Sequence, residues 1–213
     1  MVSSPAPKLD QRLVRGRTTR EQILDAAAGV LQAEGGAGAT TRAVAEAAGV
    51  RLSLVHYHFG GKGGLLAELL ERENARLLER QEALYAGPGP LADKWRTACA
   101  YLREDLRSGY ARVLWELWAA CLADEELAGR WRDAMAGWRS LVERVLVRWT
   151  AEHGLELPVP PRVLATLVAN AFQGAEVEIL AGVAEQDAPH LEALEAVADL
   201  IEWYERPLRA RNV

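Results

Sequence analysis

The chain has 213 residues, half of them hydrophobic, and a formal net charge of −5. This length can hold one large or two small domains with proper cores. No apolar run reaches the ~20 residues that span a bilayer, and the N-terminus has no signal-peptide pattern, so we expect a cytoplasmic protein with no membrane partner. Cys99 and Cys121 lie in apolar helical segments, which predicts reduced core thiols rather than a disulfide.

The charge is distributed unevenly along the chain. Residues 1–62 contain eight Lys or Arg and five Asp or Glu, a net charge of +3, which leaves −8 for the remainder. A basic first part on an acidic remainder attracts phosphate toward one end only. The distribution therefore supports a nucleic-acid partner for the first part of the chain.

The first 40 residues predict a tail followed by one helix. Residues 1–16 are polar and basic, and we expect them to be disordered, either as a solvated tail or as an arm along DNA. Thr18 and Glu21 are spaced as a capping box, which predicts that a helix begins at Thr18. The glycine-rich run at residues 35–38 is predicted to end that helix.

Residues 40–62 predict two short helices joined by a tight turn. The Thr40 hydroxyl can cap the first of them, and Thr41 could do the same. Gly49 stands where this helix must stop, because glycine adopts a left-handed backbone without a Cβ penalty. A small residue at Ala45, then this glycine, then a short amphipathic helix is the pattern of a DNA-reading helix-turn-helix.

Two spaced motifs make the match closer than a generic helix-turn-helix. They read Thr40-x-Arg42-x-Val44-Ala45-x-x-Ala48-Gly49-Val50 and His56-Tyr57-His58-Phe59-x-x-Lys62-x-x-Leu65-Leu66. Together they resemble the tetracycline-repressor (TetR) family of bacterial regulators, over roughly residues 18–70. The resemblance implies a DNA-binding head over residues 17–62, a ligand-binding and dimerisation domain over residues 63–213, and repression as the default activity.

The recognition helix is predicted over about residues 51–58, where the chain departs from the family pattern. The family often has a small hydroxyl residue at position 51, a threonine at 54 and a tyrosine at 56. Arg51 can bind guanine O6 and N7 in bidentate fashion, whereas Leu54 cannot donate to a phosphate. The candidate DNA-binding residues are Thr40, Thr41, Arg42, Arg51, Leu52, Ser53, His56, Tyr57 and Lys62, the last beside free helix amides that can hold a phosphate.

The rest of the chain predicts about six more helices and no strand, hence an all-α fold with a helix-turn-helix head and a helical bundle. The expected ranges are 62–85, 91–107, 110–123, 125–153, 162–186 and 189–206, the last ending before Pro207. The small residues of 162–186, together with 189–206, resemble the helix pair through which the family forms homodimers. A two-fold dimer presents two reading helices to the half-sites of palindromic double-stranded DNA.

One carboxylate interrupts the apolar stripe of residues 162–186. Because burying an unpaired charge costs several kcal/mol, Glu176 pairs with an arginine, lies at the solvent edge, or faces a ligand cavity. The seven tryptophans either fill the core and interface or line an aromatic pocket. In the second case the ligand-binding residues are Trp115, Trp118, Trp138, Phe172 and Glu176, a set that favours an organic cation as the small-molecule effector.

The sequence leaves two rival functions beside that of a ligand-released repressor. One is a small-molecule or lipid-binding protein of the same fold that has lost DNA binding, which the residues at 51, 54 and 56 would allow. The other is an enzyme, but no spacing of a nucleophile with its base, or of an acid with a base, is present. We expect no cofactor and no metal, since His56 and His58 point ~200° apart on a helix.

Overall fold

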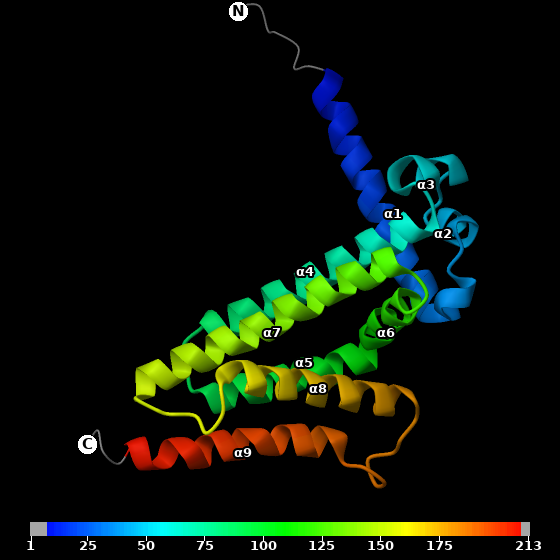
Figure 1. Cartoon of the computed structure of the whole chain (residues 1–213). Helices are drawn as coiled ribbons and strands as arrows, with labels where there is room; N and C mark the ends of the chain where they lie inside the picture. The colour runs from blue at the N-terminus through cyan, green and yellow to red at the C-terminus, as the bar shows by residue number, and fades with distance from the viewer. Residues whose placement is uncertain (1–7, 210–213) are drawn as a thin grey trace, which may run out of the picture.

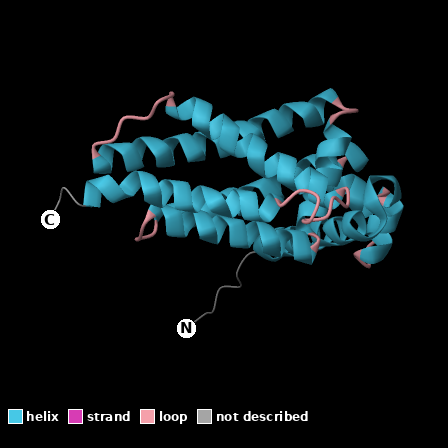
Figure 2. Ribbon diagram, turned by 90° about the horizontal axis from the view of Figure 1, so that it is seen from below, coloured by secondary structure: helices cyan, strands magenta, loops and turns pink. Residues whose placement is uncertain are grey.

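The computed structural model describes the backbone of residues 8–209 and the side chains of residues 18–205. Within that part the chain forms nine α-helices and no strand, which confirms the all-α prediction (Figures 1 and 2). The helices are α1 (Lys8–Gly38), α2 (Thr41–Ala47), α3 (Leu52–Phe59), α4 (Lys62–Ala86), α5 (Leu91–Ser108), α6 (Tyr110–Cys121), α7 (Glu125–His153), α8 (Pro161–Leu180) and α9 (His190–Arg209).

Helix α1 differs from the sequence prediction at its start. It begins at Lys8, ten positions before Thr18, so Thr18 lies inside the helix and cannot act as its cap. Residues 8–16, which we expected to belong to a disordered arm, are part of α1, and residues 1–7 lie outside the described part. The segment that follows Pro7 contains mostly good helix formers. The capping-box pattern therefore predicted a helix start at a position where the helix continues. Gly35 then breaks the helix as predicted, with φ 68° and ψ −178°.

Helices α1, α2 and α3 form a head at one end of the molecule (Figure 1). The Thr40 hydroxyl accepts from the Ala43 amide at 3.1 Å, and Gly49 has φ 65°, so both predicted boundaries of α2 are confirmed. Ala45 is buried where α2 crosses its neighbours, and Val55 and Phe59 anchor α3 in the same core. The opposite side of α3 is left free to face outward.

The long helices α4 and α7 run side by side from the head to the far end of the body, and α5, α8 and α9 pack below them (Figure 1). Helix α8 ends at Leu180, not near residue 186, because the chain turns at Ala181 and at Gly182, where φ is 91°. Helix α9 continues to Arg209, so the prediction that it stops before Pro207 is wrong.

The apolar interior is divided into three clusters. The first joins the head to α4 and α6, since Val113, Leu117 and Cys121 belong to the same buried cluster as Ile23 and its neighbours. The second lies between α5, α8 and α9 around Trp95, and the third lies between α4 and α7. Cys99 and Cys121 are buried free thiols, which confirms the prediction for both.

Candidate functional site

Helix α3 presents an outward surface of mixed chemistry. Val55 and Phe59 are buried, while Tyr57 is 81% exposed and Leu54 is 36% exposed, so the outward side of α3 includes apolar groups. The exposed side chains of this surface and its N-terminal flank are Arg51, Ser53, Leu54, His56 and Tyr57. Such a surface combines a guanidinium, hydroxyls and apolar groups, the chemistry that reads base edges and phosphates in a major groove.

The other candidate DNA-binding residues have more varied positions. Leu52 is partly buried against the head core, so only part of its side chain faces outward. Arg42 is exposed on α2, whereas Thr41 is partly buried and the Thr40 hydroxyl caps α2. Of the candidates on α2, Arg42 is therefore the most accessible to a phosphate.

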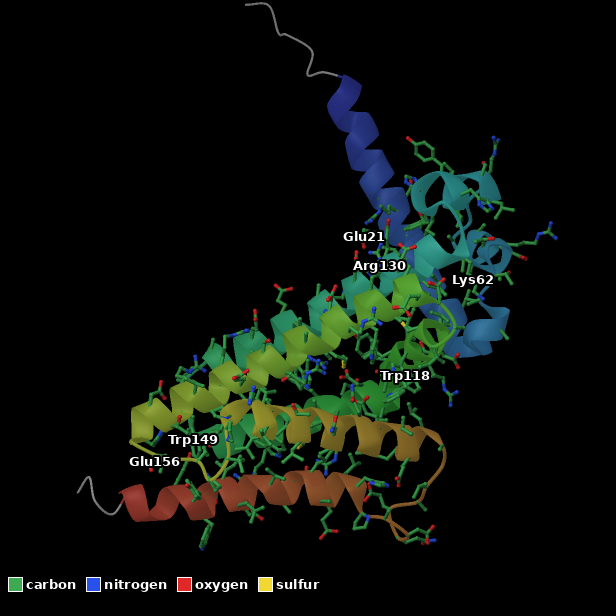
Figure 3. The ribbon with its side chains drawn as sticks, viewed as in Figure 1. Glu21, Lys62, Trp118, Arg130, Trp149 and Glu156 are labelled. Atoms are coloured by element: carbon green, nitrogen blue, oxygen red, sulfur yellow. The ribbon has the colours of Figure 1, made fainter. Side chains whose placement is uncertain are left out.

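Lys62 lies at the start of α4, beside the turn that ends α1 (Figure 3). Its ammonium donates to the Gly36 carbonyl oxygen at 2.8 Å, and the side chain is otherwise exposed. Because an ammonium has three donors, this bond leaves capacity for a phosphate. Lys62 thus has a structural contact that the sequence did not predict.

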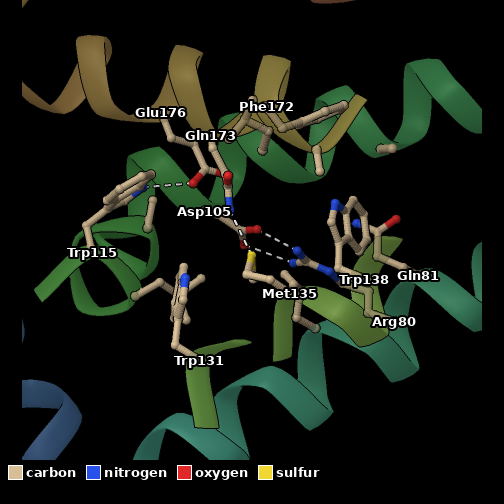
Figure 4. A pocket seen from close by; sticks show the side chains of 16 residues that line it. Arg80, Gln81, Asp105, Trp115, Trp131, Met135, Trp138, Phe172, Gln173 and Glu176 are labelled. Atoms are coloured by element: carbon tan, nitrogen blue, oxygen red, sulfur yellow. Dashed lines mark hydrogen bonds and ion pairs between the residues drawn. The ribbon is translucent and has the colours of Figure 1, made fainter. Parts of the chain in front are cut away.

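A cavity of about 80 Å³ lies in the body, and five helices line it (Figure 4). We call it the polar cavity because its largely apolar lining includes Arg80, Gln81, Asp105, Gln173 and Glu176. Four of the five predicted ligand-binding residues border it, namely Trp115, Trp138, Phe172 and Glu176. Trp118 is not in this lining; it packs edge-on against Trp115 with 5.0 Å between ring centroids. Of the three positions considered for Glu176, the structure has the one facing a cavity.

The Glu176 carboxylate has one hydrogen bond within the described residues, from Trp115 Nε1 to Oε2 at 2.9 Å. Burial raises the pKa of Glu176 to about 7; the Trp115 hydrogen bond opposes the shift and the Asp105 charge adds to it. This carboxyl therefore changes its charge near neutral pH.

A second charged group in the polar cavity is already neutralised. Arg80 on α4 makes a bidentate pair with Asp105 on α5, with Nη1–Oδ1 at 2.9 Å and Nη2–Oδ2 at 2.5 Å. The guanidinium also stacks on Tyr101, 4.6 Å from the ring centroid. The pair leaves Glu176 as the cavity's one carboxylate without a cationic partner among the described residues.

A larger, apolar cavity of about 450 Å³ adjoins the polar one. None of the described residues that line it carries a charge. Ala98, Trp138 and Phe172 border both cavities. The other lining residues include Tyr85, Trp95, Val145, Trp149, Leu164, Ile201 and Tyr204. This volume falls in the range of small-molecule sites, about 300–1,000 Å³.

Hydrogen bonds at the turn that ends α1 connect the head to the body. Glu116 Oε2 on α6 accepts from the Gly36 amide at 2.7 Å, and Gln32 Nε2 donates to the Ser108 carbonyl oxygen at 2.6 Å. Glu116 follows Trp115, which contacts Glu176 in the polar cavity. Adjacent residues of α6 therefore contact the cavity and the head.

Sequence reasoning missed most of the cavity lining. The signal that identified Glu176, a polar residue within an apolar helical stripe, was also present at Arg80 and Gln81, between Leu77 and Leu84 of α4. The apolar cavity gave no such signal, because its residues have the composition of an ordinary core.

Comparisons with known proteins agree with this architecture. Residues 23–69 match the family model for bacterial regulatory proteins of the tetR family. The structure is similar to the reduced form of Escherichia coli NemR, with a TM-score of 0.70 and 20% identity over 86% of this chain and 96% of that one. The structure is also similar to a transcriptional regulator from Rhodococcus sp. Rha1, with a TM-score of 0.71 and 24% identity over 88% of this chain and 96% of that one. No curated protein matches the sequence.

A third similar structure is Bacillus subtilis FadR in complex with stearoyl-CoA, with a TM-score of 0.67 and 16% identity over 85% of this chain and 96% of that one. At these identities the structures establish the fold, and the family match covers the helix-turn-helix of the head. Residues 23–69 thus match the tetR-family model of bacterial regulatory proteins, and the chain as a whole has the fold of the similar transcriptional regulators.

Proposed function

We propose that the protein is a homodimeric transcriptional repressor that binds a palindromic operator through α3 and is released by a small molecule bound in the body. The observation that carries the proposal is the outward surface of α3, which holds Arg51, His56 and Tyr57 exposed on a helix anchored by Val55 and Phe59. In this proposal residues 17–62 read DNA and residues 63–213 bind the ligand and the second subunit.

The dimer is supported by an exposed apolar surface on α8 and α9. Leu167 is 58% exposed on α8 and Trp203 is 67% exposed on α9, and small residues such as Ala171 and Gly174 lie on the same side of α8. Helix α8 is long and apolar enough to cross a membrane by length and composition alone. A second copy of this helix pair would cover the surface and explain the same composition.

Ligand release is supported by the route from the cavity to the head. FadR, a protein of the same fold, accommodates stearoyl-CoA, and this chain has two adjoining cavities in its body. A ligand that alters the Trp115–Glu176 contact would move α6, and with it Glu116 and the turn at Gly36. The head spacing of the dimer would then change, provided that the ligand binds the two states with different affinity.

A mobility-shift assay with the DNA that flanks the protein's own gene tests the DNA-binding part. We expect a complex that weakens steeply with salt and that an unrelated duplex does not compete away. Binding that is equally weak for every duplex would favour the rival function, a small-molecule binding protein without an operator.

The dimer is tested by Leu167→Glu, with Leu122→Glu as the matched control. Leu122 is 71% exposed between α6 and α7, away from the proposed interface. Sedimentation should show a monomer for the first variant and a dimer for the second. A dimer that persists with Leu167→Glu, Trp203→Glu and both changes together would contradict the proposed interface.

A further inference from the structure

We propose that the effector is an amphipathic amine, with its apolar body in the apolar cavity and its protonated amine in the polar cavity beside Glu176. The inference rests on the proposed ligand-regulated function and narrows the effector to a chemical class. It is carried by the contrast between the two cavities and by their shared wall.

The apolar cavity determines the body of the ligand. Its lining is aliphatic and aromatic, and its indole groups are already engaged where they reach polar atoms. Trp95 Nε1 donates to the Leu194 carbonyl oxygen at 2.6 Å, and Trp149 Nε1 donates to Glu205 Oε1 at 2.9 Å. A polar group placed here would lose its water without gaining a hydrogen bond, so this cavity selects a hydrocarbon chain or ring.

The polar cavity determines the head group through its unpaired polar atoms, which include one buried donor, Arg80 Nε, besides the acceptors. Gln81 Oε1 is buried without a hydrogen-bond partner within the described residues. Glu176 has one hydrogen bond, which occupies one carboxylate oxygen. Gln173 Nε2 is directed at the Met135 sulfur at 2.7 Å, and a thioether is a weak acceptor that a ligand can replace. A donor-rich group satisfies the two acceptors, Gln81 Oε1 and the Glu176 carboxylate, and leaves Arg80 Nε unpaired.

Charge and aromatic groups favour a cation over a neutral donor. Both Nη atoms of Arg80 are paired with Asp105, so the charge of the guanidinium is balanced within the protein, and only Nε has no partner among the described residues. Trp115, Trp131 and Trp138 line the same cavity, and aromatic faces attract a cation within about 6 Å of the ring centroid. A carboxylate head would instead meet Glu176, and the two like charges would repel each other.

The two cavities lie close enough for one molecule to occupy both. Ala98, Trp138 and Phe172 border each of them, and Trp138 and Phe172 are partly buried rather than locked in the core. The polar cavity is small, about 80 Å³ against about 450 Å³, as expected for a compact amine at the end of a longer body. The size difference sets the orientation of the ligand.

Binding should depend on pH through Glu176. The titratable groups that line its cavity are Arg80 on α4 and Asp105 on α5, which neutralise each other, while α6 and α7 contribute tryptophans and Met135. With a pKa of about 7, Glu176 is mostly protonated at pH 6 and mostly ionised at pH 8. Because an ammonium binds the ionised form, affinity should be about tenfold higher at pH 8 than at pH 6.

The test uses three probes with one hydrocarbon chain and different heads: decylamine, decan-1-ol and decanoate, each below its aggregation concentration. Isothermal titration calorimetry of the full-length protein at pH 8 should rank decylamine about tenfold or more tighter than decan-1-ol, with decanoate weakest. Butylamine, which has the same head and a short body, should bind much more weakly than decylamine, since each buried methylene contributes up to about fourfold.

Glu176→Gln should bring decylamine to within about threefold of decan-1-ol and remove the pH dependence of amine binding. Glu79→Gln is the control, since Glu79 is an exposed carboxylate on α4 that does not line either cavity. Decylamine that binds no tighter than decan-1-ol, or that keeps its advantage in Glu176→Gln, would overturn the inference. If Glu176→Gln does not fold, the ranking of the three probes on the native protein decides.

A mobility-shift assay with the same probes separates this inference from the proposed function. Decylamine that binds as expected but leaves the DNA complex intact would contradict ligand release while the ligand class stands. Operator release by decanoate rather than decylamine would support the proposed function and overturn the ligand class.

Discussion

The head and the body place their sites in opposite ways. In the head the candidate residues come from a stretch of 23 positions, 40–62, and most of them are exposed on or beside α2, α3 and the start of α4. In the body the cavity residues come from five helices and lie inside, so that no two helices alone define the site (Figure 4). An outer surface tolerates exchange of single side chains, whereas an internal cavity changes its shape with each of its walls.

Gly64→Ala should have the largest effect on the head, because it should lower both stability and DNA binding. A Cβ at Gly64 would lie 2.0 Å from the Phe59 carbonyl oxygen, so α3 and α4 would have to separate. We expect a loss of about 3 kcal/mol in the free energy of unfolding and no DNA binding, as measured by urea denaturation and mobility shift. The neighbouring Gly63 has nothing within 4 Å of its Cβ position, so Gly63→Ala should fold normally. Equal stability of the two variants would contradict the close contact.

Arg51→Ala should change what the head reads rather than whether it folds. Arg51 is exposed at the N-terminal end of α3. If it binds one guanine, its removal should relax preference at one operator position by about 2 kcal/mol. Binding selection from a randomised operator pool measures this. Uniform weakening across all sequences would assign Arg51 to the phosphate backbone instead.

Glu116→Ala should uncouple the two regions. Loss of the hydrogen bond from the Gly36 amide should lower stability by about 1.5 kcal/mol and leave ligand affinity in the body unchanged. The ligand should then release DNA less effectively, which a titration of ligand against the DNA complex measures. Glu116→Gln keeps an acceptor and should retain most of the coupling. Full release by the alanine variant would exclude this contact as a route.

The burial of Glu176 in the body should make the stability of the protein depend on pH. The pKa of Glu176 is raised in the folded state, so the folded protein holds a proton that the unfolded chain releases as pH rises above about 4.5. Stability from this group is therefore complete below pH 4.5 and declines up to about pH 7. Glu176→Gln should raise the melting temperature at pH 8 by a few degrees and change it little at pH 4.5. A difference independent of pH would exclude this titration as the cause.

Lys62→Ala should have the smallest effect. If Lys62 holds one phosphate, DNA binding weakens for every sequence and the salt slope falls by about one. Titrations over a range of salt concentration measure the slope. Lys62→Arg keeps the charge and should keep the slope. An unchanged slope in Lys62→Ala would leave the bond to the Gly36 carbonyl oxygen as its role.

Sequence patterns predicted the head well because its boundaries depend on local chemistry. Thr40 and Gly49 act through their own backbone, so the position of each helix end could be predicted from neighbouring residues. The start of α1 could not, because a capping-box pattern also occurs inside a helix. In the body, Glu176 was found as an exception within a stripe, but its partner Trp115 lies 61 positions away and no local pattern connects them.

The apolar cavity also could not be predicted from local sequence patterns. Trp95, Trp149 and Tyr204 have the spacing of core residues, and whether they fill a core or line a cavity depends on how closely their helices approach. That approach is set by the packing of α5 against α9 and of α7 against α4 and α8. Composition alone therefore gives the kind of lining but not the empty volume.

The buried cluster that joins α1 to α6 has a consequence for engineering. A fragment that ended at residue 62 would lack Val113, Leu117 and the first turns of α4, and would leave Ile23 and Leu31 in water. The head therefore cannot be moved to another protein on its own. Fused to a different effector domain, it would need other apolar residues in place of those of α6 before it could fold.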